Sequence, residues 1–219
     1  SNLAMCLSEK GAKAEAESLW RIAWPAQKKA LGEDHPDTLA TASNLAMRSW
    51  EKGNYAEAEW SWRYVWTARK RILGEDHPDT LLVLTSLAGA AAGQGRLDEA
   101  ENLYRQALEG YRRALGENHT DTLVSQQHLA TVLQLQDKLT EAELLFRQTL
   151  QAAENIDRFT FARIQGNYGV CLLKMQRYAD AEAQFLASQA VLVAKLGPLH
   201  PYAQKAADNL VELYGAWGK

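Results

Sequence analysis

The sequence has little of what several classes of protein require. It contains only two cysteines in 219 residues, which is too few for a disulfide framework and fits a reducing compartment. No apolar run approaches the roughly 20 residues of a membrane-spanning helix. The first residues also lack the apolar stretch of a secretory signal. We therefore expect a cytoplasmic protein that does not enter the membrane.

An excess of positive charge is also missing. The chain has 24 Lys and Arg against 27 Asp and Glu, a formal net charge of −3, which excludes nucleic-acid binding driven by bulk charge. Hydrophobic residues make up 47% of the sequence, which is enough to bury a core and too much for a disordered segment. The five prolines are few for this length, and their scarcity favours long helices.

Motifs for catalysis are absent. The sequence has no GxSxG, P-loop, HExxH or CxxC motif, and no nucleophile can be matched with a base. Acidic pairs such as Glu57 with Glu59 recur where a helix start is expected to be solvated. We therefore expect no enzymatic activity and no cofactor.

The main feature that the sequence does contain is an internal repeat. The segment GEDHPDTL begins at Gly32 and again at Gly74, and GENHTDTL begins at Gly116, so the spacing is constant (74 − 32 = 42 and 116 − 74 = 42). A series of Leu-Ala pairs keeps this spacing and shortens it once, between Leu129 and Tyr168 (168 − 129 = 39). Stacked repeats of this length predict a single solenoid. The repeats are approximately residues 1–31, 32–73, 74–115, 116–154, 155–196 and 197–219, with the first and last truncated, as in a fragment of a longer protein.

Each repeat is predicted to form two helices, here called helix A and helix B. Helix A begins at His-Pro, because proline suits the first helical position and Asp37 or its equivalent adds negative charge there. Helix B follows a short turn, begins at Tyr or Leu, and ends at a leucine such as Leu31 or Leu73 before a glycine. We expect eleven helices and no strand, beginning with a truncated helix near residues 2 to 10. The three-residue deletion predicts that the fourth helix B is the shortest and ends near Ala153.

These repeats resemble a known family. The stretch NLAMRSWEKGNYAEAE at residues 44–59, followed by a long helix ending in ILGEDHPDTL, resembles the 42-residue tetratricopeptide repeat of kinesin light chains. The resemblance covers the whole chain and implies an all-α, right-handed superhelix of about five helix pairs plus a terminal helix. It also implies a scaffold for protein–protein interaction in which the helices A line the concave surface.

One position on helix A is mostly asparagine. Asparagine is a poor residue in the middle of a helix, and its amide can both donate and accept a hydrogen bond. The resemblance implies that these side chains bracket the backbone of a bound peptide; the alternative is that they hydrogen-bond within or between helices. The residues at this position are Asn2, Asn44, Ser86, His128, Asn167 and Asn209. The other candidate peptide-binding residues on this face are Met47, Trp50, Gly89, Gly93, Gln127, Thr131, Arg163 and Lys205.

Small residues predict a hollow on the third repeat. Gly89, Ala92 and Gly93 leave the inner side of that repeat nearly bare. Met47 and Trp50 of the preceding repeat would form the wall of the hollow. Such an apolar space suits a bulky side chain of a partner. The alternative is that the small residues admit a neighbouring helix.

Four of the seven tryptophans lie in one repeat. Trp62 and Trp66 are four residues apart on helix B and are predicted to lie at core positions. Trp20 and Trp24 hold the equivalent positions one repeat earlier. Trp60 lies off this stripe, so we expect it on the outer surface or against the adjoining repeat.

Histidine and cysteine do not predict a metal site or a disulfide. One histidine recurs at the helix A start of four repeats, and stacked helices hold these rings too far apart to share a metal ion. Cys6 and Cys171 occupy equivalent positions four repeats apart, so we expect free thiols. The histidines are His35, His77, His119 and His200.

Two functions are compatible with these features. The first is a scaffold that binds an extended peptide segment of a partner protein, of unknown identity, on the helix A face. The second is a structural or regulatory spacer that self-associates, or packs on a catalytic domain such as a Ser/Thr kinase outside this sequence. Weak self-association is expected through the truncated ends, where apolar surface would lack its natural cover. At one end this surface consists of Leu210, Leu213, Tyr214 and Trp217.

Overall fold

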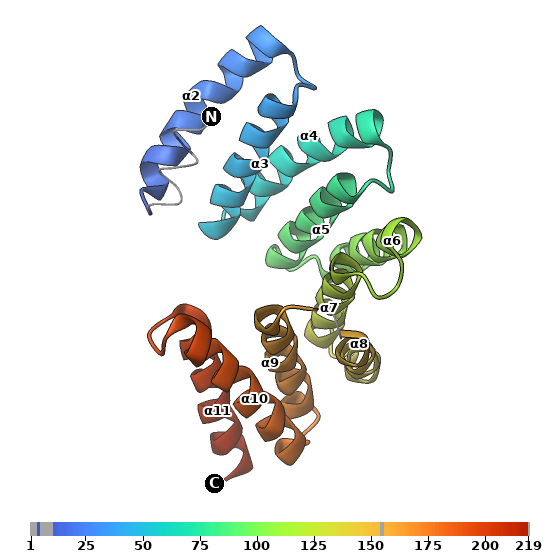
Figure 1. Ribbon diagram of the computed structural model, residues 1–219, viewed down its shortest axis with the longest axis vertical. Coiled ribbons are helices and arrows are strands. Elements are labelled where there is room, and N and C mark those ends of the chain that lie inside the picture. The colour runs from blue at the N-terminus through green and yellow to red at the C-terminus, as the bar shows by residue number, and fades with distance from the viewer. Residues whose placement is uncertain (1–3, 5–10, 154–155, 219) are drawn as a thin grey trace. The chain divides into compact units, whose positions relative to one another are not determined.

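The computed structural model describes residues 4, 11–153 and 156–218 (Figure 1). These residues form ten α-helices and no strand, so the expected all-α fold is confirmed. No helix among them is both long and apolar enough to cross a membrane. The predicted helix near residues 2 to 10 falls largely outside the described residues. The helices are α2 (Lys13–Leu31), α3 (Pro36–Glu51), α4 (Tyr55–Leu73), α5 (Pro78–Gly93), α6 (Leu97–Leu115), α7 (Thr120–Leu135), α8 (Leu139–Ala152), α9 (Arg158–Lys174), α10 (Tyr178–Leu196) and α11 (Pro201–Trp217).

The chain divides into two compact units. Unit 1 (Ser1–Ala114) holds α2 to α6, apart from the last residue of α6, and unit 2 (Leu115–Lys219) holds α7 to α11. The even-numbered helices are helices B, and the odd-numbered ones are helices A. α2, α4, α6 and α10 each end at a leucine followed by glycine, as predicted. α8 has 14 residues where the other helices B have 19, so the predicted shortening is confirmed.

A histidine side chain caps four of the helices A. The imidazole Nδ1 of the histidine before α3, α5, α7 and α11 accepts a hydrogen bond from the backbone N–H two residues later, at 3.1 to 3.3 Å. Before α9, the carboxylate of Asp157 accepts from the N–H groups of Phe159 and Thr160 instead, at 2.9 and 3.2 Å. Among the described residues, no three His, Cys, Asp or Glu side chains could together hold a metal ion.

The turn between helix A and helix B needs one residue with a positive φ. In unit 1 this residue is Gly53, at 79°, and Gly95, at 77°. In unit 2 it is Asp137, at 58°, and Gln176, at 60°. Because a residue with a Cβ rarely adopts this conformation, the two turns of unit 2 are strained and those of unit 1 are not.

The core of unit 1 lies between its helices A and B. Trp20 is 3% exposed and Trp62 is 4% exposed, which confirms both as core residues. Trp24 and Trp66 are only partly buried and pack against the core from its edge. The prediction that these two tryptophans lie at core positions therefore overestimated their burial. Trp60 is 61% exposed, as its position off the stripe predicted.

The core of unit 2 includes side chains of α11. Leu213 is fully buried and Leu210 is 7% exposed, so the prediction that they lack cover is wrong. The reason is that α11 packs against α9 and α10, and these side chains point into that contact. Trp217 stacks on Tyr178 with ring centroids 5.8 Å apart. Tyr214 hydrogen-bonds Glu182.

The one described cysteine is Cys171, on α9. Its thiol is buried and free. Burial raises the pKa of this thiol to about 11, so it stays protonated and unreactive at neutral pH. Cys6, also predicted to be a free thiol, lies outside the described residues.

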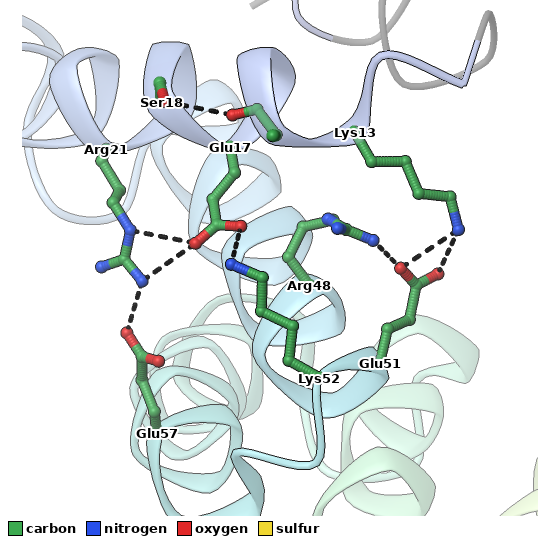
Figure 2. A network of polar contacts seen from close by, with 9 residues as sticks. Lys13, Glu17, Ser18, Arg21, Arg48, Glu51, Lys52 and Glu57 are labelled. Atoms are coloured by element: carbon green, nitrogen blue, oxygen red, sulfur yellow. Dashed lines mark hydrogen bonds and ion pairs between the residues drawn. The ribbon is translucent and has the colours of Figure 1, made fainter.

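A polar network joins α2, α3 and α4 within unit 1 (Figure 2). Glu17 on α2 is 8% exposed, and its carboxylate accepts hydrogen bonds from Arg21 at 3.2 Å and from Lys52. Arg21 also donates to Glu57 on α4, at 2.9 Å. The hydrogen bond from Lys52, followed by that from Arg21, holds the pKa of Glu17 below its ordinary value. The carboxylate is therefore charged, bonded directly to the residue that ends α3 and linked to α4 through Arg21.

Glu59, in the first turns of α4, is also engaged, although the sequence predicted a solvated helix start. The side chain of Glu59 is only 15% exposed. It accepts a hydrogen bond from Gln94 at 2.8 Å and pairs with Arg63 and Arg96. The Glu59 carboxylate therefore connects consecutive repeats, whereas the side chains of Glu57 and Glu99 are both 41% exposed.

Candidate functional site

The candidate peptide-binding residues lie on the helices A of both units. In unit 1, Asn44, Met47 and Trp50 lie on α3. The remaining residues of this unit, on α5, are Ser86, Gly89 and Gly93. In unit 2 the residues on α7, α9 and α11 are Gln127, His128, Thr131, Arg163, Asn167, Lys205 and Asn209. Asn2 lies outside the described residues.

The described asparagines of this face are unpartnered. The side-chain amides of Asn44, Asn167 and Asn209 make no hydrogen bond to any other described residue. Asn209 is nevertheless only 7% exposed. The alternative, that these amides bond within or between helices, is therefore not seen in the described part of the chain. An amide in this state keeps its donor and its acceptor available for a ligand.

Three of the other candidates are satisfied by their own helix. Ser86 Oγ donates to the carbonyl of Leu82 at 3.0 Å. Gln127 is 4% exposed and donates through Nε2 to Thr131 Oγ1 at 3.1 Å, while Thr131 donates to the Gln127 carbonyl at 3.0 Å. These side chains therefore have less to offer a ligand than the asparagines have.

His128 takes the asparagine position on α7 but differs in its chemistry. Burial lowers the pKa of its imidazole to about 4, and the positive charge of Arg163 on α9 contributes to the shift. The ring is therefore neutral at physiological pH. It also lies near enough to Arg163 for the two to interact electrostatically.

The predicted hollow on the third repeat is filled at Gly93, so that prediction is wrong there. A Cβ on Gly93 would lie 2.8 Å from the ring of Tyr55, and one on Gly89 would lie 3.3 Å from the Tyr104 hydroxyl. The small residues admit rings of neighbouring helices, Tyr55 on α4 and Tyr104 on α6, which agrees with the alternative that they admit a neighbouring helix. Met47 and Trp50 remain 45% and 41% exposed and offer an apolar surface on α3.

Unit 2 contains a hollow that brings four of the candidates together, here called the α9–α11 hollow. Its volume is about 180 Å³. α9 contributes Arg163 and Asn167, and α11 contributes Lys205 and Asn209, so each helix supplies one cation and one amide. The complete lining is Arg163, Gly166, Asn167, Ser188, Leu192, Tyr202, Lys205, Ala206 and Asn209.

This hollow carries positive charge without a compensating carboxylate. Its lining has two cations and no acidic residue. Neither Arg163 nor Lys205 forms an ion pair with any carboxylate in the described residues. The Arg163 guanidinium lies between two rings, 5.6 Å from the centroid of Tyr202 and 5.9 Å from that of Phe159. Aromatic faces can hold a guanidinium while its N–H groups stay free to bind an anion.

Two lining residues with a side-chain hydroxyl were missed from the sequence. Tyr202 is spaced three and seven residues before Lys205 and Asn209, so helical periodicity could have placed it on the same face of α11. Ser188 belongs to α10 and donates through Oγ to the Ala162 carbonyl at 2.7 Å. Nothing local marks Ser188, because its place in the hollow depends on how α10 packs against α9.

Models of one family match the chain. They are described as tetratricopeptide repeat and match residues 1–37, 38–79, 67–113 and 84–155, which together span residues 1–155. No curated protein shows significant similarity to the chain.

Solved structures of tetratricopeptide-repeat proteins are similar to the fold. The nearly identical repeats of a kinesin light chain from Podosopora anserina are 24% identical with a TM-score of 0.70, covering 89% of this chain and 94% of that one. BtubC (BKLC) from P. vanneervenii is 21% identical with a TM-score of 0.73, covering 91% and 80%. YrrB, described as a TPR protein with an unusual peptide-binding site, is 17% identical with a TM-score of 0.52, covering 94% and 89%.

Proposed function

The chain belongs to the tetratricopeptide-repeat family, whose fold generally mediates protein–protein interaction, and on that premise we propose that it binds an extended peptide segment of a partner protein along its helix A face. Tetratricopeptide-repeat proteins are typically non-catalytic scaffolds, and we propose the same for this chain. The description of YrrB as a peptide-binding TPR protein supports the idea that a similar fold can hold a peptide.

The unpartnered asparagine amides carry this proposal. Asn44, Asn167 and Asn209 hold the same repeat position, and each has a free donor and a free acceptor in the described structure. None of the three amides has a polar atom that is both sealed from water and unbonded, so they are accessible to a ligand. An extended peptide suits them, since its backbone presents an N–H and a carbonyl at regular intervals.

The charge of the α9–α11 hollow indicates what kind of residue the peptide carries there. Arg163 and Lys205 have no carboxylate partner within the described structure. A carboxylate of the peptide would pair with both cations, and Arg163 can hold that carboxylate with two parallel hydrogen bonds. We therefore propose that the segment over unit 2 is acidic.

A displayed library of random peptides tests the proposal. The wild-type chain should enrich peptides with Asp or Glu, and their affinity should fall with rising salt concentration. Asn44→Ala and Asn167→Ala should each weaken the binding of a selected peptide by about 1 kcal/mol or more, roughly fivefold in Kd. The melting temperature should not fall comparably. Asn102→Ala, an exposed position on a helix B, is the matched control and should leave binding unchanged.

Two outcomes would count against peptide binding on this face. Parallel losses of melting temperature and affinity would show that the asparagines are structural. Failure to enrich any peptide, together with concentration-dependent sedimentation, would favour the alternative function, a spacer that self-associates.

A further inference from the structure

Two helices A of unit 2 carry a cation at a repeat position that is apolar in the other described helices A. The position lies five residues before each Leu-Ala pair or its equivalent, and in α3, α5 and α7 it holds Ala40, Leu82 and Val124. In α9 and α11 it holds Arg163 and Lys205, which both line the α9–α11 hollow. Because the other three helices form without a cation here, the fold does not require one.

The same two helices lack a carboxylate that the others have near their starts. Three residues before the position just described, α9 has Thr160 and α11 has Tyr202. An aspartate there would lie within reach of the cation three residues later, because residues i and i+3 are neighbours on a helix. Cations have therefore been gained, and their nearest potential partners lost, in the two helices that share one hollow. The aspartates of α3, α5 and α7 at this position are Asp37, Asp79 and Asp121.

The hollow consequently offers two uncompensated positive charges. Arg163 and Lys205 have no carboxylate partner among the described residues. Lys195, at the end of α10, is already paired with Asp157 at 3.7 Å. His128 adds no charge, since burial, together with the charge of Arg163, lowers the pKa of its imidazole to about 4. A ligand with two negative charges would match the hollow.

A carboxylate and a phosphate monoester would meet this requirement to different degrees. A carboxylate brings one negative charge and two oxygens, and the guanidinium fork of Arg163 can occupy both. Lys205 would then share an oxygen, and the hollow would keep one positive charge. A phosphate monoester carries a charge of about −1.5 to −2 at pH 7 and has three terminal oxygens, so one oxygen remains for Lys205.

We propose that the α9–α11 hollow recognises a phosphorylated serine in the partner peptide. This inference rests on the proposed peptide binding along the helix A face, and it names the acidic group that the peptide presents there. Arg163 would hold two phosphate oxygens and Lys205 the third. Asn167 and Asn209 follow these cations by four residues, one turn further along each helix, where their amides would bind the peptide backbone.

This spacing favours serine as the phosphorylated residue. The cation and the amide of each helix are about 6 Å apart along the helix axis, from the rise of four residues. The short side chain of serine keeps its phosphate close to the backbone, so that one residue can reach both turns. The ring of a phosphotyrosine would separate the phosphate from the backbone.

Three degenerate peptide pools, identical except for a fixed central residue of phosphoserine, glutamate or serine, test this site. Fluorescence anisotropy measures the binding of each pool to the full chain. The phosphoserine pool should bind about tenfold more tightly than the glutamate pool, or better, because it neutralises both cations. The serine pool should bind most weakly.

Variants of the hollow show whether the phosphate lies there. Lys205→Met should remove most of the preference for phosphoserine over glutamate, whereas Arg158→Met, which removes an exposed cation of α9 outside the lining, should leave the preference unchanged. Tyr202→Asp restores the carboxylate of the other helices A and should abolish the preference. Tyr202→Asn is its matched control, since it removes the same ring without adding a charge, and it should retain the preference. All four variants should keep a melting temperature close to that of the wild type, because these side chains are exposed.

The possible failures are distinguishable. Equal affinities of the phosphoserine and glutamate pools would overturn the phosphate assignment and leave peptide binding on the helix A face standing. If no pool bound, the proposed function would fail together with this inference. A phosphoserine preference that survived in both Lys205→Met and Tyr202→Asp would place the phosphate outside the hollow and would also overturn the proposal.

Discussion

Replacing Glu17 by Gln tests how much the network of Figure 2 contributes to stability. The substitution keeps the shape of the side chain and removes its charge. In the wild type, the carboxylate accepts hydrogen bonds from Arg21 and Lys52, and it is among the least exposed carboxylates of the chain. The amide can still accept one hydrogen bond, but without the assistance of a negative charge.

The expected loss follows from the exposure of the three groups. Breaking a fully buried ion pair costs about 3–5 kcal/mol, because one charge stays buried without a partner. Here the side chains of Arg21 and Lys52 are 52% and 47% exposed, so water solvates them when the carboxylate is gone. We therefore expect Glu17→Gln to lower the free energy of unfolding by about 1.5 kcal/mol at neutral pH, the size of one or two charge-assisted hydrogen bonds.

The loss should depend on pH in one direction. The folded state holds the pKa of Glu17 below its ordinary value of 4.5, chiefly through the hydrogen bond from Lys52. The stabilisation is therefore fully present above the pKa of the unfolded chain, and it disappears as the pH falls through the lower pKa of the folded state. Urea unfolding followed by far-UV circular dichroism, at pH 7 and at about pH 3, measures both limits.

Glu15→Gln is the matched control for this experiment. Glu15 lies two residues earlier on α2 but is exposed and has no partner among the described residues, so the loss in Glu15→Gln should stay below about 0.5 kcal/mol. The reasoning would be refuted if the two variants lost equal stability at pH 7. It would also be refuted if the loss in Glu17→Gln were the same at both pH values.

Two further predictions concern the turns and the caps. Gln176→Gly should raise the free energy of unfolding by about 1 kcal/mol, because glycine adopts the positive φ of this turn without strain. Gly95→Ala should lower the free energy of unfolding by a similar amount, and urea midpoints measure both changes. If Gln176→Gly were less stable than the wild type, side-chain contacts of Gln176 would outweigh the strain. His77→Ala should lower the free energy of unfolding by about 1 kcal/mol, because it removes the side-chain cap of α5. His77→Asn should retain most of this stability, since asparagine can also cap a helix. Equal losses in the two variants would assign the cost to packing instead of capping.

Local signals in the sequence were sufficient to place the helices. Pro36 and Pro78 begin helices A, and Leu31 and Leu73 end helices B before a glycine, as predicted. These signals act over a few residues of the chain, because a fixed φ or a missing N–H takes effect where it stands. The capping by histidine is equally local, but imidazole is not among the usual capping groups, and its role appeared only in the structure.

The candidate site was predicted only in part, because periodicity places a residue on a face of its own helix and does not say what covers that face. The asparagine position was visible as a repeat, and the structure then showed that Asn44 and Asn167 have no partner among the described residues. Whether Gly93 borders a hollow depended on the ring of Tyr55, which comes from the start of another helix, α4.

The sequence by itself therefore determined the fold class, the helix ends and the repeat positions, since each follows from short-range geometry that recurs in every repeat. Tertiary structure alone decided which of those positions stay open. Arg163 and Lys205 hold the same position in consecutive repeats and meet in one hollow because α9 and α11 both pack on α10. Whether such a space is filled depends on which side chains of neighbouring helices extend into it, and the packing of the helices decides that.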